Sequence, residues 1–198
     1  MSEIQANKLS PASGTALQIG DASDVITIPS GATIQNSGTA TGFGEANTPA
    51  FSVQQGNNQS QSVSDATNTK VELDDEYFDT DNAFDTSTYR FTVPNGKAGK
   101  YFFTWSIFLY QDTVSNLQSA EAMLYLNGSK YVNDLKVYQN NYIRYGTQGG
   151  SAFLNLSVGD YVELYGNVNS VDGGGSPQFY GGDRATYLTG FRVTSWVH

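Results

Sequence analysis

Cysteine is absent from the 198 residues, so the chain has no disulfide bond. This absence excludes a disulfide-stapled scaffold and any cysteine-based metal site. Histidine occurs once, as the final residue His198, and terminal residues are rarely held firmly enough to serve in catalysis. We therefore expect no Ser-His-Asp triad, no histidine-based metal site and no enzymatic activity.

Positive charge is also scarce. Lys and Arg total 10 against 19 Asp and Glu, which gives a formal net charge of −9. Nucleic acids and anionic membrane surfaces require a cluster of basic side chains, and here the basic residues are scattered singly. No apolar run approaches the roughly 18 residues of a membrane-spanning helix. The first ten residues lack the apolar core of a signal peptide, so we expect no secretion signal.

Residues that favour strands and tight turns are abundant. The chain contains 21 Gly, 13 Tyr and 11 Phe, interleaved with Ser, Thr and Asn. Aromatic residues favour strands, and glycine and asparagine favour the turns between them. Eight or more short strands are expected after residue 49. They predict an all-β, antiparallel sandwich or jelly roll.

The strongest predicted strand runs from Gly99 to Gln111 and is apolar on both faces. Phe102, Phe108 and Tyr110 alternate with a second set on the opposite face: Tyr101, Phe103, Trp105, Ile107 and Leu109. A strand that is apolar on both faces is typical of a sandwich interior or of an interface between chains. Further along, Asn127-Gly128 between alternating segments predicts a hairpin turn.

Residues 1–48 differ from the remainder. They are rich in Ser, Thr, Ala and Gly, and contain three short strand-like segments at 16–19, 25–28 and 32–35, each followed by turn residues. Segments this short cannot bury a core of their own. We expect them to order by winding with other chains or by docking on a larger partner, and the alternative is a flexible linker.

Residues 72–85 hold seven acidic and no basic residues. Hard oxygen ligands suit Ca²⁺, and the candidate ligands are Asp74, Asp75, Asp79 and Asp81. Because the EF-hand spacing is absent, a solvated loop that protects an edge strand is the favoured interpretation. A pair of these carboxylates also leaves glycoside hydrolysis open, although any such cluster would offer a pair.

The Gly-rich segment 169–183 is expected to form a long loop. Together with its flanks it offers amide, aromatic and charged groups that suit sugar or protein recognition. The candidate ligand-binding residues are Asn167, Asn169, Asp172, Gln178, Tyr180 and Arg184. A long loop without a binding role is an equal alternative.

From Pro49 onward the chain resembles the complement-one-q-like and tumour-necrosis-factor-like family. The motifs that carry the resemblance are Pro49-Ala50-Phe51-Ser52, Gly99-Lys100-Tyr101-Phe102-Phe103-Thr104-Trp105, Leu126-Asn127-Gly128, Ser157-Val158-Gly159-Asp160-Tyr161-Val162 and Thr186-Tyr187-Leu188-Thr189-Gly190-Phe191. Leu73 departs from the pattern, standing where the family has Phe, and no collagen-like stalk is present. The resemblance covers about three-quarters of the chain.

This resemblance implies a ten-stranded jelly roll over residues 49–198 that forms a homotrimer through aromatic strand faces. The expected interface residues are Tyr101, Phe103, Trp105, Tyr187 and Phe191. A fold does not specify a ligand, because function depends on the surfaces built on it.

Residues 1–48 resemble the short anchoring segments of structural proteins in marine tailed phages of the cyanophage type. The resemblance rests on the stretches 9–17, 28–34 and 39–43. It implies a virion protein in which residues 1–48 anchor the chain to other virion proteins and 49–198 project as a trimeric fibre or knob. Such a knob is expected to contact a host surface glycan or protein. The alternatives are a capsid or tail decoration protein without host contact and, further, a tailspike-like glycan hydrolase.

Overall fold

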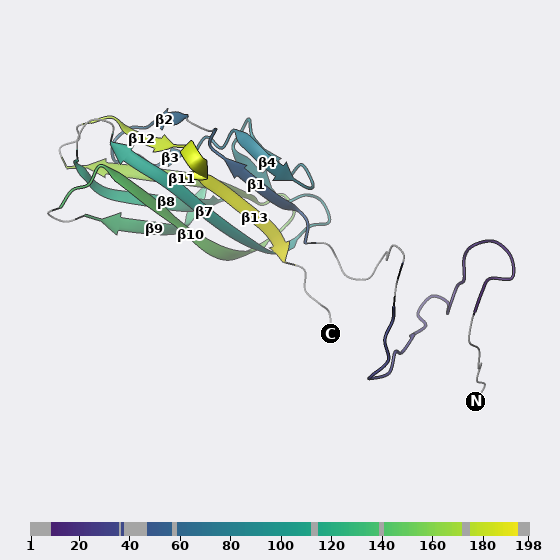
Figure 1. Ribbon diagram of the computed structural model, residues 1–198. Coiled ribbons are helices and arrows are strands. Elements are labelled where there is room, and N and C mark those ends of the chain that lie inside the picture. The colour runs from purple at the N-terminus through teal and green to yellow at the C-terminus, as the bar shows by residue number, and fades with distance from the viewer. Residues whose placement is uncertain are drawn as a thin grey trace. The chain divides into compact units, whose positions relative to one another are not determined.

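The chain divides into two compact units, Met1–Thr41 and Gly42–His198. The computed structural model describes residues 9–35, 37, 47–56, 59–111, 115–138, 141–171 and 175–193 (Figure 1). No helix within these ranges is long and apolar enough to cross a membrane.

The second unit is a sandwich of two antiparallel sheets. Sheet A has seven strands: β2 (Ser60–Ser62), β12 (Pro177–Tyr180), β7 (Gly99–Gln111), β13 (Tyr187–Val193), β1 (Ala50–Gln54), β4 (Asp75–Asp79) and β10 (Tyr145–Leu156). Sheet B has six: β5 (Phe84–Asp85), β6 (Arg90–Thr92), β11 (Tyr161–Ser170), β8 (Leu117–Leu126), β9 (Ser129–Val137) and β3 (Thr69–Lys70). The helical element in the described residues is one 3-10 turn, η1 (Gly182–Arg184). The predicted all-β sandwich is confirmed, whereas the predicted count of ten strands is not, because the described residues alone contain thirteen.

Strand β7 organises sheet A because three other strands pair with it. Strand β10 pairs along one edge from Gly99 to Tyr110, while β13 and β12 share the other edge. Strand β1 extends the sheet by pairing with β13, so that Ala50 lies opposite Phe191. The start of β1 and the end of β13 therefore lie at the same end of the domain (Figure 1).

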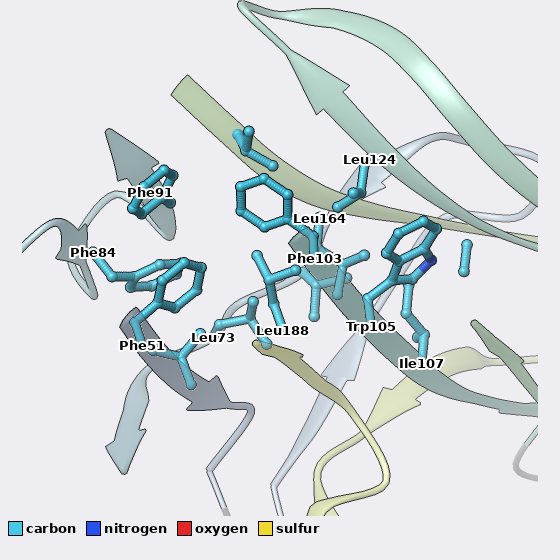
Figure 2. Packing of buried hydrophobic residues seen from close by; sticks show 14 of the residues in the cluster. Phe51, Leu73, Phe84, Phe91, Phe103, Trp105, Ile107, Leu124, Leu164 and Leu188 are labelled. Atoms are coloured by element: carbon cyan, nitrogen blue, oxygen red, sulfur yellow. The ribbon is translucent and has the colours of Figure 1, made fainter. Parts of the chain in front are cut away.

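The core between the sheets is mainly aromatic and aliphatic. Phe51 stacks on Phe91 with 4.9 Å between ring centroids, and Phe103 meets Phe91 edge-on at 5.7 Å (Figure 2). Each such ring buries on the order of 150–250 Å² and dominates the packing energy. A Cβ added at Gly190 would lie 2.7 Å from the Phe103 ring, which shows how closely the backbone approaches the core.

The first unit contains extended segments joined by turns. The three strand-like segments predicted at 16–19, 25–28 and 32–35 are not paired into any sheet within the described residues. Gly20 and Gly31 occupy the left-handed region with φ of +82° and +85°, which non-glycine residues rarely adopt. The turns predicted there are therefore present, and the segments between them have no strand partner within the described residues.

Candidate functional site

Three of the five predicted interface residues lie inside the protomer. Tyr101, Phe103 and Trp105 are 0–2 % exposed and belong to the core cluster. They have no surface to offer a partner chain, so their assignment to an interface was wrong. The reason is the parity of β7, whose odd-numbered side chains all face sheet B. Burial raises the pKa of Tyr101 to about 12, and its hydroxyl donates to the Lys97 carbonyl at 2.6 Å.

The even-numbered side chains of β7 face outward and join aromatic residues of its neighbours. Tyr187 and Phe191 of β13 are on this side, as are Phe153 and Tyr145 of β10, which lie opposite Phe102 and Tyr110. We call this surface the aromatic face, and its members are Phe102, Phe108, Tyr110, Tyr145, Phe153, Tyr180, Tyr187 and Phe191.

The ring contacts of the aromatic face form two groups, with Thr104 and Ser106 of β7 between them. At one end the Phe102 ring contacts Phe153 at 4.9 Å and Phe191 at 5.7 Å. At the other end Tyr110 contacts Tyr145 and Tyr180 at 5.9 and 6.1 Å. The phenylalanine end is the end at which β1 begins, because Ala50 pairs with Phe191.

Hydrogen bonds order the tyrosine end. The Tyr110 hydroxyl donates to Gln178 Oε1 at 2.7 Å and lies 3.2 Å from the Ser60 hydroxyl. Strand pairing positions these groups, since Gln178 of β12 is the partner of Tyr110. These bonds hold the Tyr110 side chain in place without a partner, which lowers the entropy cost of association at this end.

The four candidate calcium ligands do not converge. Among the described residues no group of three or more acidic or histidine side chains is arranged to hold a metal ion. The carboxylates instead accept bonds from the protein. Asp74 caps the Gly56 N–H at 2.7 Å, Asp75 accepts from Gln54, Asp79 accepts from the Phe84 N–H at 2.7 Å, and Asp81 lies 3.5 Å from the Lys97 ammonium. The predicted site is therefore not formed here, since each carboxylate serves a separate turn or ion pair.

Asp85, at the end of the acidic stretch, stabilises a tight turn. Its carboxylate accepts from the Ser87 hydroxyl at 2.6 Å, the Thr88 hydroxyl at 2.8 Å and the Ser87 N–H at 2.8 Å. These hydrogen bonds, that of the Ser87 hydroxyl foremost, lower the pKa of Asp85 to about 2. A depressed pKa suits a structural acceptor and not a general acid.

The predicted ligand-binding residues are divided between opposite sides of the domain. Asn167 and Asn169 are on β11 and point outward from sheet B, whereas Gln178 and Tyr180 are on β12 and point outward from sheet A. Arg184 lies in η1, with its guanidinium 4.2 Å from the Tyr77 ring centroid. Asp172 lies outside the described residues. The expected single loop was wrong, because β11 continues to Ser170 and a further strand occupies 177–180.

Asn167 belongs to a polar and aromatic cluster on the outer face of sheet B that was not predicted. Its Nδ2 donates to Asn68 Oδ1 at 2.7 Å, and Asn68 Nδ2 donates to the Tyr125 hydroxyl at 3.0 Å. The Tyr125 and Tyr165 rings are stacked at 4.0 Å. The sequence contained a signal for this cluster, because polar and aromatic residues alternate with apolar or small ones over 161–170. The alternating residues are Tyr161, Glu163, Tyr165, Asn167 and Asn169.

An ion network lies beneath this cluster. Glu163 is 1 % exposed, and its Oε1 accepts from the Lys70 ammonium at 2.7 Å and the Arg90 guanidinium at 2.8 Å. Arg90 also covers the Tyr161 ring at 3.8 Å. Lys70 and Arg90 therefore join the short strands β3 and β6 to the edge of β11 that does not pair with β8.

Comparison with known proteins agrees with the architecture. The family model described as C1q domain matches residues 50–191. Among solved structures, the globular domain of zebrafish complement 1qA is 18% identical at a TM-score of 0.51, covering 73% of this chain and 97% of its own. Murine APRIL at pH 5.0 is 10% identical with a TM-score of 0.51 (73% and 99% covered), and Eiger TNF from S. frugiperda is 11% identical with a TM-score of 0.50 (75% and 94% covered). These identities establish the fold alone. No curated protein matches.

Proposed function

The chain belongs to the C1q domain family, and on that premise we propose that it is a non-enzymatic binding protein that assembles as a homotrimer through the aromatic face. The observation that carries the proposal is the size and exposure of that face. Eight aromatic side chains gather on one side of sheet A, and Phe153 among them remains 67 % exposed. Contiguous apolar patches of this kind mark interaction sites, since monomers rarely leave them in water.

We expect two further copies of the same chain to cover the aromatic face, because the face is chemically complementary to itself. Phenylalanine gathers at one end and hydrogen-bonded tyrosine at the other, so identical copies aligned in parallel bring like groups together. Tyr187 and Phe191, two of the originally expected interface residues, keep that role. Tyr101, Phe103 and Trp105 are replaced by Phe102, Phe108 and Tyr110 of the same strand.

The proposed setting is a virus particle. In this proposal residues 1–48 attach the chain to other virion proteins, and 49–198 project as a fibre or knob. The support is the two-part layout and the resemblance of 9–43 to phage anchoring segments. A decoration protein without host contact is the alternative within the same setting. Particles lacking this protein that adsorb to the host normally but break more easily would favour decoration.

The proposed ligand surface is the outer face of sheet B. If three copies cover the aromatic face, this opposite side stays open to solvent. It presents Tyr125, Tyr165 and Asn167 in an ordered cluster, and aromatic rings with amides are the groups that commonly recognise sugars and proteins. A host surface glycan or protein is the proposed partner. Asn167→Ala should then reduce adsorption without changing the solution mass.

The first test is the solution mass of the purified protein by light scattering, with and without EDTA. A mass about three times the 21.4 kDa of one chain, unchanged by EDTA, is expected. A monomer over the whole accessible concentration range would refute assembly through the aromatic face. A trimer lost in EDTA would restore a calcium-dependent site to consideration.

A further inference from the structure

The N-terminal segment carries large apolar side chains that are largely exposed within the described residues. Within residues 9–35 the side chains of Leu17, Ile19, Val25, Ile26, Ile28 and Ile34 are between 46 and 86 % exposed. Burial of one such side chain is worth on the order of 1.5–3 kcal/mol, so a stretch with six of them is strongly favoured to find a partner. The question is which partner the segment fits.

Two apolar pairs recur in the segment with the same geometry. Leu17 and Ile19 form the first pair, and Ile26 and Ile28 form the second, nine positions later in each case. In an extended chain residues i and i+2 point to the same side, so each pair forms one apolar edge. Ser30 and Gly31 turn the chain after the second pair, and Gly20 does so after the first.

The backbone is unpaired along these extended stretches. The backbone hydrogen bonds within residues 9–35 are those of two turns, Asp24 N–H to the Asp21 carbonyl and Ala32 N–H to the Pro29 carbonyl, both at 3.0 Å. In the extended pieces at 16–19 and 25–28, no backbone N–H or C=O group is hydrogen-bonded to the backbone of another described residue. An extended stretch with unpaired backbone groups and an apolar edge is a template for strand pairing with another chain.

Charge and connectivity favour further copies of this chain as the partner. Asp21 and Asp24 are the charged residues between 9 and 35, and Asp24 Oδ2 accepts from the Asp21 N–H at 2.8 Å, so their repulsion is confined to one turn.

In each domain β1 begins at the phenylalanine end of the aromatic face, because the Arg192 N–H donates to the Pro49 carbonyl at 2.9 Å and Ala50 pairs with Phe191. Three associated domains would thus receive their N-terminal segments from one end, which raises their effective concentration to the millimolar range.

We propose that residues 16–35 of three copies pair with one another and form a three-chain β stalk, with Leu17, Ile19, Ile26 and Ile28 turned toward its axis. The proposal rests on the homotrimer proposed above and adds to it a second, independent assembly element. It also separates the stalk from particle attachment, which would fall to residues outside 16–35. Val25, on the opposite side of the strand from Ile26, faces solvent in this arrangement.

Hydrogen exchange of the full chain tests the stalk, with light scattering on the same samples. Backbone amides in peptides covering 16–19 and 25–28 should exchange more slowly than expected for an unpaired chain, by a factor of about ten or more. The double variant Ile26→Ser/Ile28→Ser should lose this protection, and the matched control Val25→Ser should keep it. Full protection of both regions in the double variant would overturn the proposed orientation.

The outcomes distinguish the stalk from the domain interface. A trimeric mass without protection at 16–28 would overturn the stalk and leave the proposed homotrimer standing. A monomer would overturn both. If Phe153→Ser separates the domains while the chain stays trimeric and protected at 25–28, the stalk is supported on its own. Protection in a chain of monomeric mass would show pairing within the chain or with its own domain, and would overturn the inference.

Discussion

Replacing Phe153 by serine is expected to weaken assembly while leaving the single domain folded. Phe153 is 67 % exposed on the edge strand β10, and its ring contacts Phe102 at 4.9 Å on the outside of sheet A. Because the side chain takes no part in the core, the free energy of unfolding should change by less than about 0.5 kcal/mol, as for most surface substitutions. The effect should fall on association instead.

The size of that effect follows from the exposed area. An aromatic side chain buries roughly 150–250 Å² in full, so the exposed two-thirds of Phe153 amounts to roughly 100–170 Å². At about 25 cal/mol per Å², covering that area is worth about 2.5–4 kcal/mol per chain as an upper limit. Since about 1.4 kcal/mol corresponds to a tenfold change, the variant should dissociate at protein concentrations at least tenfold higher than the parent.

A dilution series followed by light scattering measures the change, and near-ultraviolet circular dichroism checks the fold. Leu135→Ser is the matched control. Leu135 is 50 % exposed on β9, on the outer side of sheet B, so its removal should not alter assembly. With Ile26→Ser/Ile28→Ser also present, so that the proposed stalk cannot hold the chains together, an unchanged dissociation midpoint in Phe153→Ser, or an equal change in Leu135→Ser, would refute the assignment of the aromatic face.

Four further outcomes follow from the interior and its turns. Phe103→Ala should lower the free energy of unfolding by about 3–5 kcal/mol in a urea titration, because the ring is fully buried among other rings. Gly149→Ala should destabilise the domain by about 1–3 kcal/mol, since the new Cβ would lie 2.3 Å from the Trp105 backbone oxygen. Glu163→Gln should cost about 2 kcal/mol by the same assay, as it removes the charge that pairs with two half-exposed cations. The carboxylate of Asp85, whose pKa is lowered to about 2, stabilises the fold at neutral pH; the stability difference from Asp85→Asn should shrink as pH falls from about 4 and vanish below about 2.

The sequence predicted the sandwich and the division of β7 into two faces. The wrong face, however, was assigned to the interface between chains. Periodicity separates Tyr101, Phe103 and Trp105 from Phe102 and its companions, yet it does not say which set meets the second sheet. The composition did contain a hint. Lys100, Thr104 and Ser106 interrupt the even-numbered face, whereas the odd-numbered face is apolar from 101 to 109.

The binding residues were harder to place because their predicted unit was a loop. Glycines between 173 and 175 indicated an irregular segment, but the strand before them extends to Ser170 and a new strand begins at Pro177. Because side chains alternate between the two faces of a strand, a difference of one residue decides on which side of the sheet a side chain lies. Asn167 and Gln178, close in sequence, consequently face away from each other on different sheets.

The doubly apolar strand explains why this domain is expected to act as an assembly. A two-layer sandwich buries one face of each sheet, and in β7 that requirement is already met by the side chains from Tyr101 to Leu109. The rings of Phe102, Phe108 and Tyr110 exceed what one protomer can cover, although threonine or serine would serve a solvent-facing strand without exposing an apolar patch. The same excess recurs in the first unit at Leu17 and Ile26, where the described residues form no second layer. The chain, otherwise acidic and polar, therefore exposes apolar area at two separate places. Association of copies of the chain aligned in parallel is the simplest way to bury both areas together.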